Sequence, residues 1–222
     1  MISWLHITGL GDTVVMLPAA AAIAVWLAMT RAWRMALVWC LMFGTGLLAV
    51  VATKIAFVGW GIGIRALDFT GISGHAMRAS AVLPVLCYLG LREAPAALRH
   101  AGLLLGIIGG ALLTLSRVAV QAHSVSEALA GFLLGSLISL AFISLCYCRP
   151  TLRIPSWLLA VTLLALLPSA YANPAPTSRW INSVALYLAG HDRPYERERW
   201  LACKARKRTV GRDVKQIIRL IY

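Results

Sequence analysis

Six apolar runs, each close to the length that spans a bilayer, restrict what this chain can fold into. The runs cover residues 13–29, 35–58, 75–91, 101–118, 126–146 and 157–170. A helix needs roughly 20 mostly apolar residues to cross the hydrocarbon core of a membrane. An open sheet cannot satisfy its backbone hydrogen bonds in lipid, so such runs are expected to be helical. The sequence therefore predicts an all-α, polytopic membrane protein with six transmembrane helices.

Composition agrees with a membrane protein and divides the chain into two parts. Of the 222 residues, 60% are hydrophobic and 13% are charged, whereas soluble domains carry about 25% charged residues. All six runs lie within residues 1–172, which we expect to form one transmembrane domain. Residues 173–222 are predicted to form a basic, partly amphipathic tail outside the membrane. From Arg179 onward the tail holds eleven Lys and Arg against four Asp and Glu, a net charge of +7.

This basic tail is predicted to contact anionic lipid headgroups. Residues 186–192 and 214–222 suit short amphipathic helices, and in the second segment apolar residues recur at helical spacing with Lys215 and Arg219 on another face. Basic amphipathic segments bind to the surface of anionic membranes. Nucleic acid is the other common partner of such charge. We expect no nucleic acid here, because the tail is predicted to lie outside the cytoplasm.

Arginines in the short loops predict how the chain is oriented. Loops 31–34, 92–99 and 149–153 lie on one side of the six predicted spans, and each holds two Arg. The positive-inside rule places that side in the cytoplasm. Both termini, and the loops that follow the second and fourth runs, then face outward. We therefore expect a multi-pass protein of the bacterial inner (cytoplasmic) membrane, with these outer loops in the periplasm.

One polar string lies between the fourth and fifth runs. It reads Ser116-Arg117, five further residues, His123, and then Glu127. His123 and Glu127 are four residues apart, so on a helix they share a face. If Glu127 accepts the N–H of one imidazole nitrogen, the other nitrogen keeps a free lone pair and can act as a nucleophile. The planar guanidinium of Arg117 suits the oxygens of a phosphoryl group, and Ser116 adds a hydroxyl donor.

A second string, Ser73-Gly74-His75, begins the third run. Ser73 suits a helix N-cap, and Gly74 lets a phosphate oxygen approach its backbone N–H closely. A helix that starts here directs its backbone N–H groups and the positive end of its dipole at the anion. On the first turn, His75 is placed to act as a general acid toward a leaving oxygen. Polar groups of this kind have a high cost in a membrane, so their presence indicates function.

Further charged residues surround the two strings. Arg78 follows His75 by three residues, Lys54 lies near the outer end of the second run, and Arg65 lies in the connecting loop. We expect all three to add positive charge, although Arg78 and Lys54 have the alternative of extending to the membrane interface. Asp68 is expected to hold Arg65 or Arg78. Both loops open on the same side of the predicted bundle, so the two strings can meet.

Together the strings resemble the type-2 phosphatidic acid phosphatase superfamily, in its integral-membrane branch. The resemblance rests on Ser-Arg-x5-His-x3-acid with an upstream Ser-Gly-His, and it covers roughly residues 54–127 and the fifth run. By this resemblance His123 forms a phosphohistidine, His75 protonates the leaving group and Glu127 orients His123. The residues that it assigns to phosphate binding are Lys54, Ser73, Gly74 and Arg117. It implies no metal and no other cofactor.

The chain departs from the pattern of that superfamily at three places. Glu127 stands where an Asp is usual, and Ile72 stands where a Pro often precedes Ser-Gly-His. In the upstream motif, which reads Lys, six residues and Arg-Pro, Lys54 is present but residues 61–62 are Gly-Ile. We expect Arg65 to supply the missing arginine's charge from another point of the loop.

The predicted function is a metal-independent lipid phosphatase or diphosphatase that works through a phosphohistidine. Candidate substrates are undecaprenyl diphosphate, phosphatidate, phosphatidylglycerophosphate and the phosphates of lipid A, and the sequence does not choose among them. One alternative is a phosphotransferase that passes the phosphate to a lipid acceptor. Another is an ion-coupled transporter that uses His75, His123 and Glu127 as a proton relay or metal site. A third is a membrane scaffold whose basic tail recruits a partner.

Overall fold

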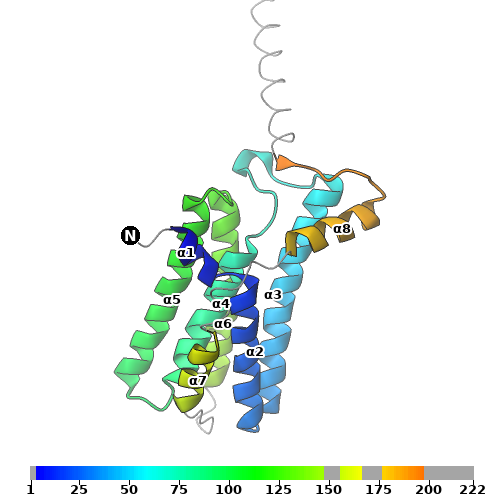
Figure 1. Ribbon diagram of the computed structural model, residues 1–222. Coiled ribbons are helices and arrows are strands. Elements are labelled where there is room, and N and C mark those ends of the chain that lie inside the picture. Colours follow the sequence, from blue (N-terminus) through cyan, green and yellow to red (C-terminus); the bar gives the residue numbers. More distant parts are fainter. Residues whose placement is uncertain (1–3, 148–155, 167–176, 198–222) are drawn as a thin grey trace, which may run out of the picture. The chain divides into compact units, whose positions relative to one another are not determined.

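The computed structural model describes residues 4–147, 156–166 and 177–197, and this part of the chain is helical with no strands (Figure 1). The α-helices are α1 (Trp4–Leu10), α2 (Thr13–Met29), α3 (Trp33–Trp60), α4 (Gly74–Gly90), α5 (Ala96–Ala119), α6 (Val125–Tyr147), α7 (Ser156–Leu166) and α8 (Thr177–Ala189). A single 3-10 turn, η1 (Arg65–Leu67), lies between α3 and α4. The all-α prediction is confirmed.

Each apolar run corresponds to one helix, from α2 to α7. Helix α2 has the predicted bounds, and the others begin or end a few residues away from theirs. Within the described residues, α3, α5 and α6 are long and apolar enough to cross a membrane. These three helices identify a membrane protein, and crossing by α2, α4 and α7 stays a prediction. The end of the sixth run, the loop 149–153 and the segment 214–222 lie outside the described residues.

The structure divides into two compact units. Unit 1 contains Met1–Ala52 and Ile72–Pro176, and unit 2 contains Thr53–Gly71 and Thr177–Tyr222. The predicted boundary between residues 172 and 173 lies outside the described residues. The sequence analysis did not predict that residues 53–71 would group with the C-terminal segment, and this grouping has consequences for the proposed phosphate ligands.

Helix α4 is the central helix of unit 1, and α5 and α6 pack against it (Figure 1). Of its 17 residues, 14 are buried. Glycines allow this close packing: a Cβ on Gly106 of α5 would lie 2.6 Å from the Cα of Pro84, and one on Gly131 of α6 would lie 2.5 Å from the carbonyl oxygen of Ser73. The helix backbones therefore touch directly, as is common for helices in membranes.

Two tryptophans join the remaining helices of unit 1. The indole N–H of Trp26 on α2 donates to the hydroxyl of Thr162 on α7 at 3.1 Å, and that of Trp39 on α3 donates to the carbonyl of Ala20 at 2.9 Å. The ring of Trp39 also contacts Phe142 of α6, with ring centroids 5.2 Å apart. Each indole is buried and has its N–H paired, as large amphipathic rings require inside a protein.

Unit 2 is held together by contacts between α3, the following loop and the C-terminal segment. A Cβ on Gly59 would lie 3.2 Å from the carbonyl oxygen of Ala185 on α8, and the backbone N–H of Tyr195 donates to the carbonyl of Val58 at 3.0 Å. The predicted short helix at 186–192 is replaced by α8, which starts at Thr177 and ends at Ala189.

Asp68, also in unit 2, has a different partner from the one expected. Its carboxylate lies 3.5 Å from Nε of Arg197, and the same guanidinium donates to the hydroxyl of Thr70 at 3.2 Å. The sequence analysis expected Asp68 to hold Arg65 or Arg78. The chain turns back after α8 and brings Arg197 to this loop, which local spacing could not indicate.

Candidate active site

The two polar strings meet because α4 and α6 begin side by side. The backbone N–H of Ser73 donates to the carbonyl of Glu127 at 3.1 Å. Gly131, in the second turn of α6, leaves room for the first turn of α4. The first turn of each helix therefore lies next to that of the other, and the side chains of both strings gather at one end of unit 1.

His123 is held by Glu127 through a short contact. Its Nδ1 lies 2.7 Å from Oε2 of Glu127, whose side chain is 1% exposed, whereas the His123 side chain is 13% exposed. A carboxylate can only accept at this bond, so Nδ1 carries the proton and Nε2 keeps the lone pair. The tautomer that this contact selects is the nucleophilic one that the sequence analysis proposed.

The contact between His123 and Glu127 joins a residue that precedes the helix to a residue in its first turn. His123 and Ser124 precede α6, which begins at Val125. The backbone N–H of Ser124 donates to the Glu127 carboxylate at 3.3 Å, and the N–H of Glu127 donates to the Ser124 hydroxyl at 3.4 Å. This reciprocal arrangement is a capping box. Because Glu suits that position of a capping box, the Glu in place of the usual Asp has a structural reason here.

His75 lies beside a carboxylate that the sequence analysis missed. Its Nε2 is 3.4 Å from Oδ2 of Asp12, in the turn between α1 and α2. The other oxygen of Asp12 accepts from the backbone N–H of Val14 at 3.1 Å and caps α2. A signal for this residue was present, since Asp12 is the only Asp, Glu, Lys or Arg among the first 30 residues.

Two arginines complete the cluster. The ionisable groups that act electrostatically on the His75 ring are Arg117, Arg78, Asp12 and His123. Arg78 is 8% exposed, which does not fit a side chain that extends to the membrane interface. Arg117, in the last turn of α5, donates from Nη1 to the hydroxyl of Thr8 on α1 at 3.0 Å. Thr8 is a second residue of the N-terminal segment that sequence reasoning did not place here.

Several buried donors at the site have no protein partner. Among the described residues, none forms a hydrogen bond with the Ser73 hydroxyl, Nε of Arg78 or Nε of Arg117. Ser73 is the N-cap residue of α4, yet its side chain makes no capping bond and is fully buried. Buried polar groups are almost always paired, so three unpaired donors in one place need an explanation. An anionic ligand would supply it.

Two predicted phosphate ligands have other uses in this fold. The Ser116 hydroxyl donates to the carbonyl of Leu113 in its own helix at 2.7 Å, and the residue is fully buried. The Ser116 hydroxyl is therefore already paired within its own helix, and its assignment to phosphate binding stays a prediction. A Cβ on Gly74 would lie 3.1 Å from Nη1 of Arg78. Gly74 thus makes room for the guanidinium of Arg78, in addition to any role of its backbone.

Lys54 and Arg65 belong to unit 2, whereas the cluster described above belongs to unit 1. Lys54 packs on Gly71, where a Cβ would lie 3.2 Å from its Cγ, and Arg65 begins η1. Their assignment to phosphate binding, and the use of Arg65 in place of the missing arginine, stay predictions.

Apolar helices that carry a cluster of two histidines and two arginines make this a membrane protein with a cationic site suited to an anion. Comparison with known proteins gives the family. Residues 63–150 match the PAP2 superfamily. An uncharacterized 22.5 kDa protein in the cps region of Klebsiella pneumoniae is 35% identical over 201 residues, which cover 88% of this chain and 96% of that protein. No solved structure matches.

The chain belongs to the PAP2 superfamily, and the resemblance to the type-2 phosphatidic acid phosphatases is confirmed. Members of this superfamily are phosphatases, which assigns the chain to the phosphoric ester hydrolases. The matched segment contains both polar strings. Thr8, Asp12 and Lys54 lie outside it.

Proposed function

We propose that this protein hydrolyses a lipid phosphate or diphosphate through a phosphohistidine on His123. The observation that carries the proposal is the 2.7 Å contact between Nδ1 of His123 and the buried Glu127, which leaves Nε2 as a nucleophile beside a cationic cluster. Attack by Nε2 forms a nitrogen–phosphorus bond as the bond to the leaving oxygen breaks. His75 gives that oxygen a proton. Water then attacks the phosphohistidine, His75 takes a proton from the water, and inorganic phosphate leaves.

Charge stabilisation is assigned to Arg78 and Arg117. Negative charge builds on the oxygens of the transferring group, and donors already in place around it lower the barrier most. The unpaired Nε atoms of both arginines and the unpaired Ser73 hydroxyl are donors of this kind. In such a site the protein acts mainly by positioning the phosphate and by offsetting its charge.

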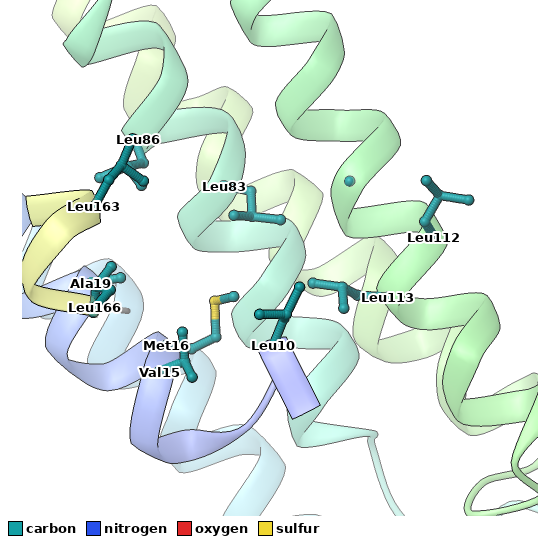
Figure 2. A pocket seen from close by; sticks show the side chains of 11 residues that line it. Leu10, Val15, Met16, Ala19, Leu83, Leu86, Leu112, Leu113, Leu163 and Leu166 are labelled. Carbon is teal, nitrogen blue, oxygen red and sulfur yellow. The ribbon is translucent and has the colours of Figure 1, made fainter. Parts of the chain in front are cut away.

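An apolar cavity beside the site supports a lipid substrate. It has a volume of about 380 Å³ and is lined by side chains from α1, α2, α4, α5 and α7 (Figure 2). Leu113 on its wall precedes Arg117 by four residues on α5, and Met16 follows Asp12 by four residues on α2. At about 1.5 Å of rise per residue, the cavity begins roughly 6 Å from the polar cluster. A hydrocarbon chain attached to a phosphate can occupy such a space.

The proposal also includes the location of the protein. The arginines of loops 31–34 and 92–99 support an orientation in which the site opens to the periplasm of a bacterial cell. The proposed contact of the tail with anionic lipid rests on its charge alone.

Trapping the phosphoenzyme tests the mechanism. Protein purified in detergent is mixed with radiolabelled phosphatidate, undecaprenyl diphosphate, phosphatidylglycerophosphate or lipid A and quenched in alkali, where phosphohistidine survives. Wild-type protein should carry label and release inorganic phosphate from at least one of them, and His123→Ala should do neither. Label on His123→Ala would contradict the mechanism.

The same assay separates the alternatives. Turnover that needs an added lipid acceptor would indicate a phosphotransferase. Loss of turnover in EDTA would indicate a metal site, although no three His, Cys, Asp or Glu of the described residues gather closely enough to hold a metal ion.

A further inference from the structure

Asp12 is an acid in an otherwise uncharged N-terminal segment, and its position is set by two contacts. Its Oδ1 accepts from the backbone N–H of Val14 at 3.1 Å, and its Oδ2 lies 3.4 Å from Nε2 of His75. The side chains of Asp12 and His75 are 17% and 21% exposed, so the pair is largely screened from solvent. The N-cap bond holds the carboxylate still while its second oxygen faces the imidazole.

The turn that carries Asp12 packs against the cluster of histidines and arginines at more than one point. A Cβ on Gly11 would lie 3.7 Å from Cδ2 of His75, so the backbone of the turn touches the edge of the ring. Thr8 accepts a hydrogen bond from Arg117, and α1 packs on α5 (Figure 1). The segment 8–12 therefore contacts both His75 and Arg117.

Asp12 also has a distinct electrostatic position. The other ionisable groups that act on the His75 ring are Arg78 on its own helix, Arg117 on α5 and His123 in the turn before α6. Burial of the ring and the two arginines oppose a positive charge on the imidazole. Within the described part of the chain, Asp12 is the one carboxylate in this set, and it favours that charge. A general acid must carry a proton when the leaving oxygen departs.

We infer that Asp12 is a positioning residue for His75, which holds its imidazole in place and favours the protonated form that gives its proton to the leaving oxygen. The inference rests on the proposed function. In the imidazolium, the N–H at Nε2 points to Asp12 and the proton at Nδ1 is given up. As the bond from His123 to phosphorus forms, the bond from phosphorus to the leaving oxygen breaks, and that oxygen takes the Nδ1 proton. The proton returns to Nδ1 when water attacks the phosphohistidine.

Dependence on the leaving group separates this role from a structural one. An alkoxide must be protonated as it leaves, whereas 4-nitrophenolate is stable without a proton. Asp12→Asn is the informative variant, because Asn caps a helix about as well as Asp but carries no charge. The two esters are an alkyl phosphate and 4-nitrophenyl phosphate, each presented to the purified full-length protein in detergent.

Asp12→Asn should lower kcat for the alkyl ester by about 10- to 100-fold, which is part of the roughly 10²–10⁴-fold that a general acid supplies. The kcat of this variant for the nitrophenyl ester should change by no more than a few fold. Its KM for each ester should stay similar to that of the wild-type protein. Asp12→Ser, which also keeps an N-cap oxygen, should show the same selectivity, and Asp12→Glu should restore part of the lost rate. The matched control is Asp192→Asn, an exposed acid, which should show no selectivity.

Two outcomes would overturn the inference. An equal loss on both esters would give Asp12 a structural or phosphate-binding role, and no loss on either would give it none. If the wild-type protein hydrolysed neither ester and formed no labelled phosphoenzyme, the result would instead contradict the proposed function, on which the inference rests. Thermal unfolding of Asp12→Asn and Asp12→Ser shows whether the fold is kept, and the ratio of the two rates within one variant is independent of the amount of folded protein.

Discussion

The two histidines of the site are each paired with a carboxylate, and the pairs are built in different ways. His123 is paired with Glu127 four residues away, at 2.7 Å, through an acid that is 1% exposed. His75 is paired with Asp12, which comes 63 residues earlier in the chain, at 3.4 Å and with both side chains partly exposed. A tight, buried pair suits a nucleophile that must keep one tautomer. A looser pair suits an acid that must gain and lose a proton.

Removing each imidazole should give the largest effects and should separate the two roles. His123→Ala is expected to lower phosphate release by about 10⁴-fold or more for every ester, because the covalent step is lost. His75→Ala should lower it by roughly 10²–10⁴-fold for an alkyl phosphate and by much less for 4-nitrophenyl phosphate. Steady-state kinetics on both esters measure this. If both variants lowered the rate by the same factor on both esters, the assignment of His123 as nucleophile and His75 as general acid would be wrong.

Changing the buried acid tests the local pair. Glu127→Gln keeps an oxygen for the Ser124 N–H but removes the charge opposite Nδ1, so kcat should fall by roughly 100-fold, less than the roughly 10⁴-fold lost in the Asp→Asn variant of a serine-protease triad. Glu127→Asp keeps the charge but shortens the side chain, so it should weaken the capping box and lower the free energy of unfolding by about 1 kcal/mol. Kinetics and thermal unfolding are measured on both variants. A Glu127→Gln protein with wild-type kcat would remove the proposed role of this carboxylate.

Filling the apolar cavity should have the smallest effect, and only on long substrates. Leu113→Trp places a larger side chain in the cavity, one helical turn from Arg117, where it should raise KM several fold for a long-chain lipid phosphate and leave a short-chain ester unchanged. Leu115→Trp, on the same helix but 57% exposed and not part of the cavity wall, is the matched control. Equal KM changes for long and short chains would show that the cavity does not hold the lipid.

The pair at His123 could be anticipated from local spacing, and the pair at His75 could not. His123 and the Ser-x-x-Glu capping sequence that follows it occupy five consecutive residues. The contact between His123 and Glu127 therefore forms as soon as the first turn of α6 forms. Asp12 reaches His75 only after α2 and α4 have packed together, and no local sequence pattern predicts that packing. Arg197 reaches Asp68 in unit 2 for the same kind of reason.

Two predicted phosphate ligands have contacts that the sequence did not indicate, for a related physical reason. The hydroxyl of Ser116 has a carbonyl of its own helix within reach and bonds to it, a competition that is common for Ser in helices. Gly74 was expected to admit a phosphate oxygen, and the fold places the Arg78 guanidinium over it. In both cases neighbouring groups in the fold give the residue a contact that local spacing could not predict.

The sequence by itself determined the helices, the two polar strings and the superfamily, because apolar length, capping chemistry and short spacing act within a few turns of chain. Tertiary structure alone decided that the starts of α4 and α6 lie side by side, that the N-terminal turn supplies a carboxylate to His75, and that an apolar cavity lies one helical turn from the arginines. These features depend on which helices pack together. Complementary surfaces determine this packing, such as the glycines of α5 and α6 that lie against α4. The sequence of one helix does not show which other helix its surface fits.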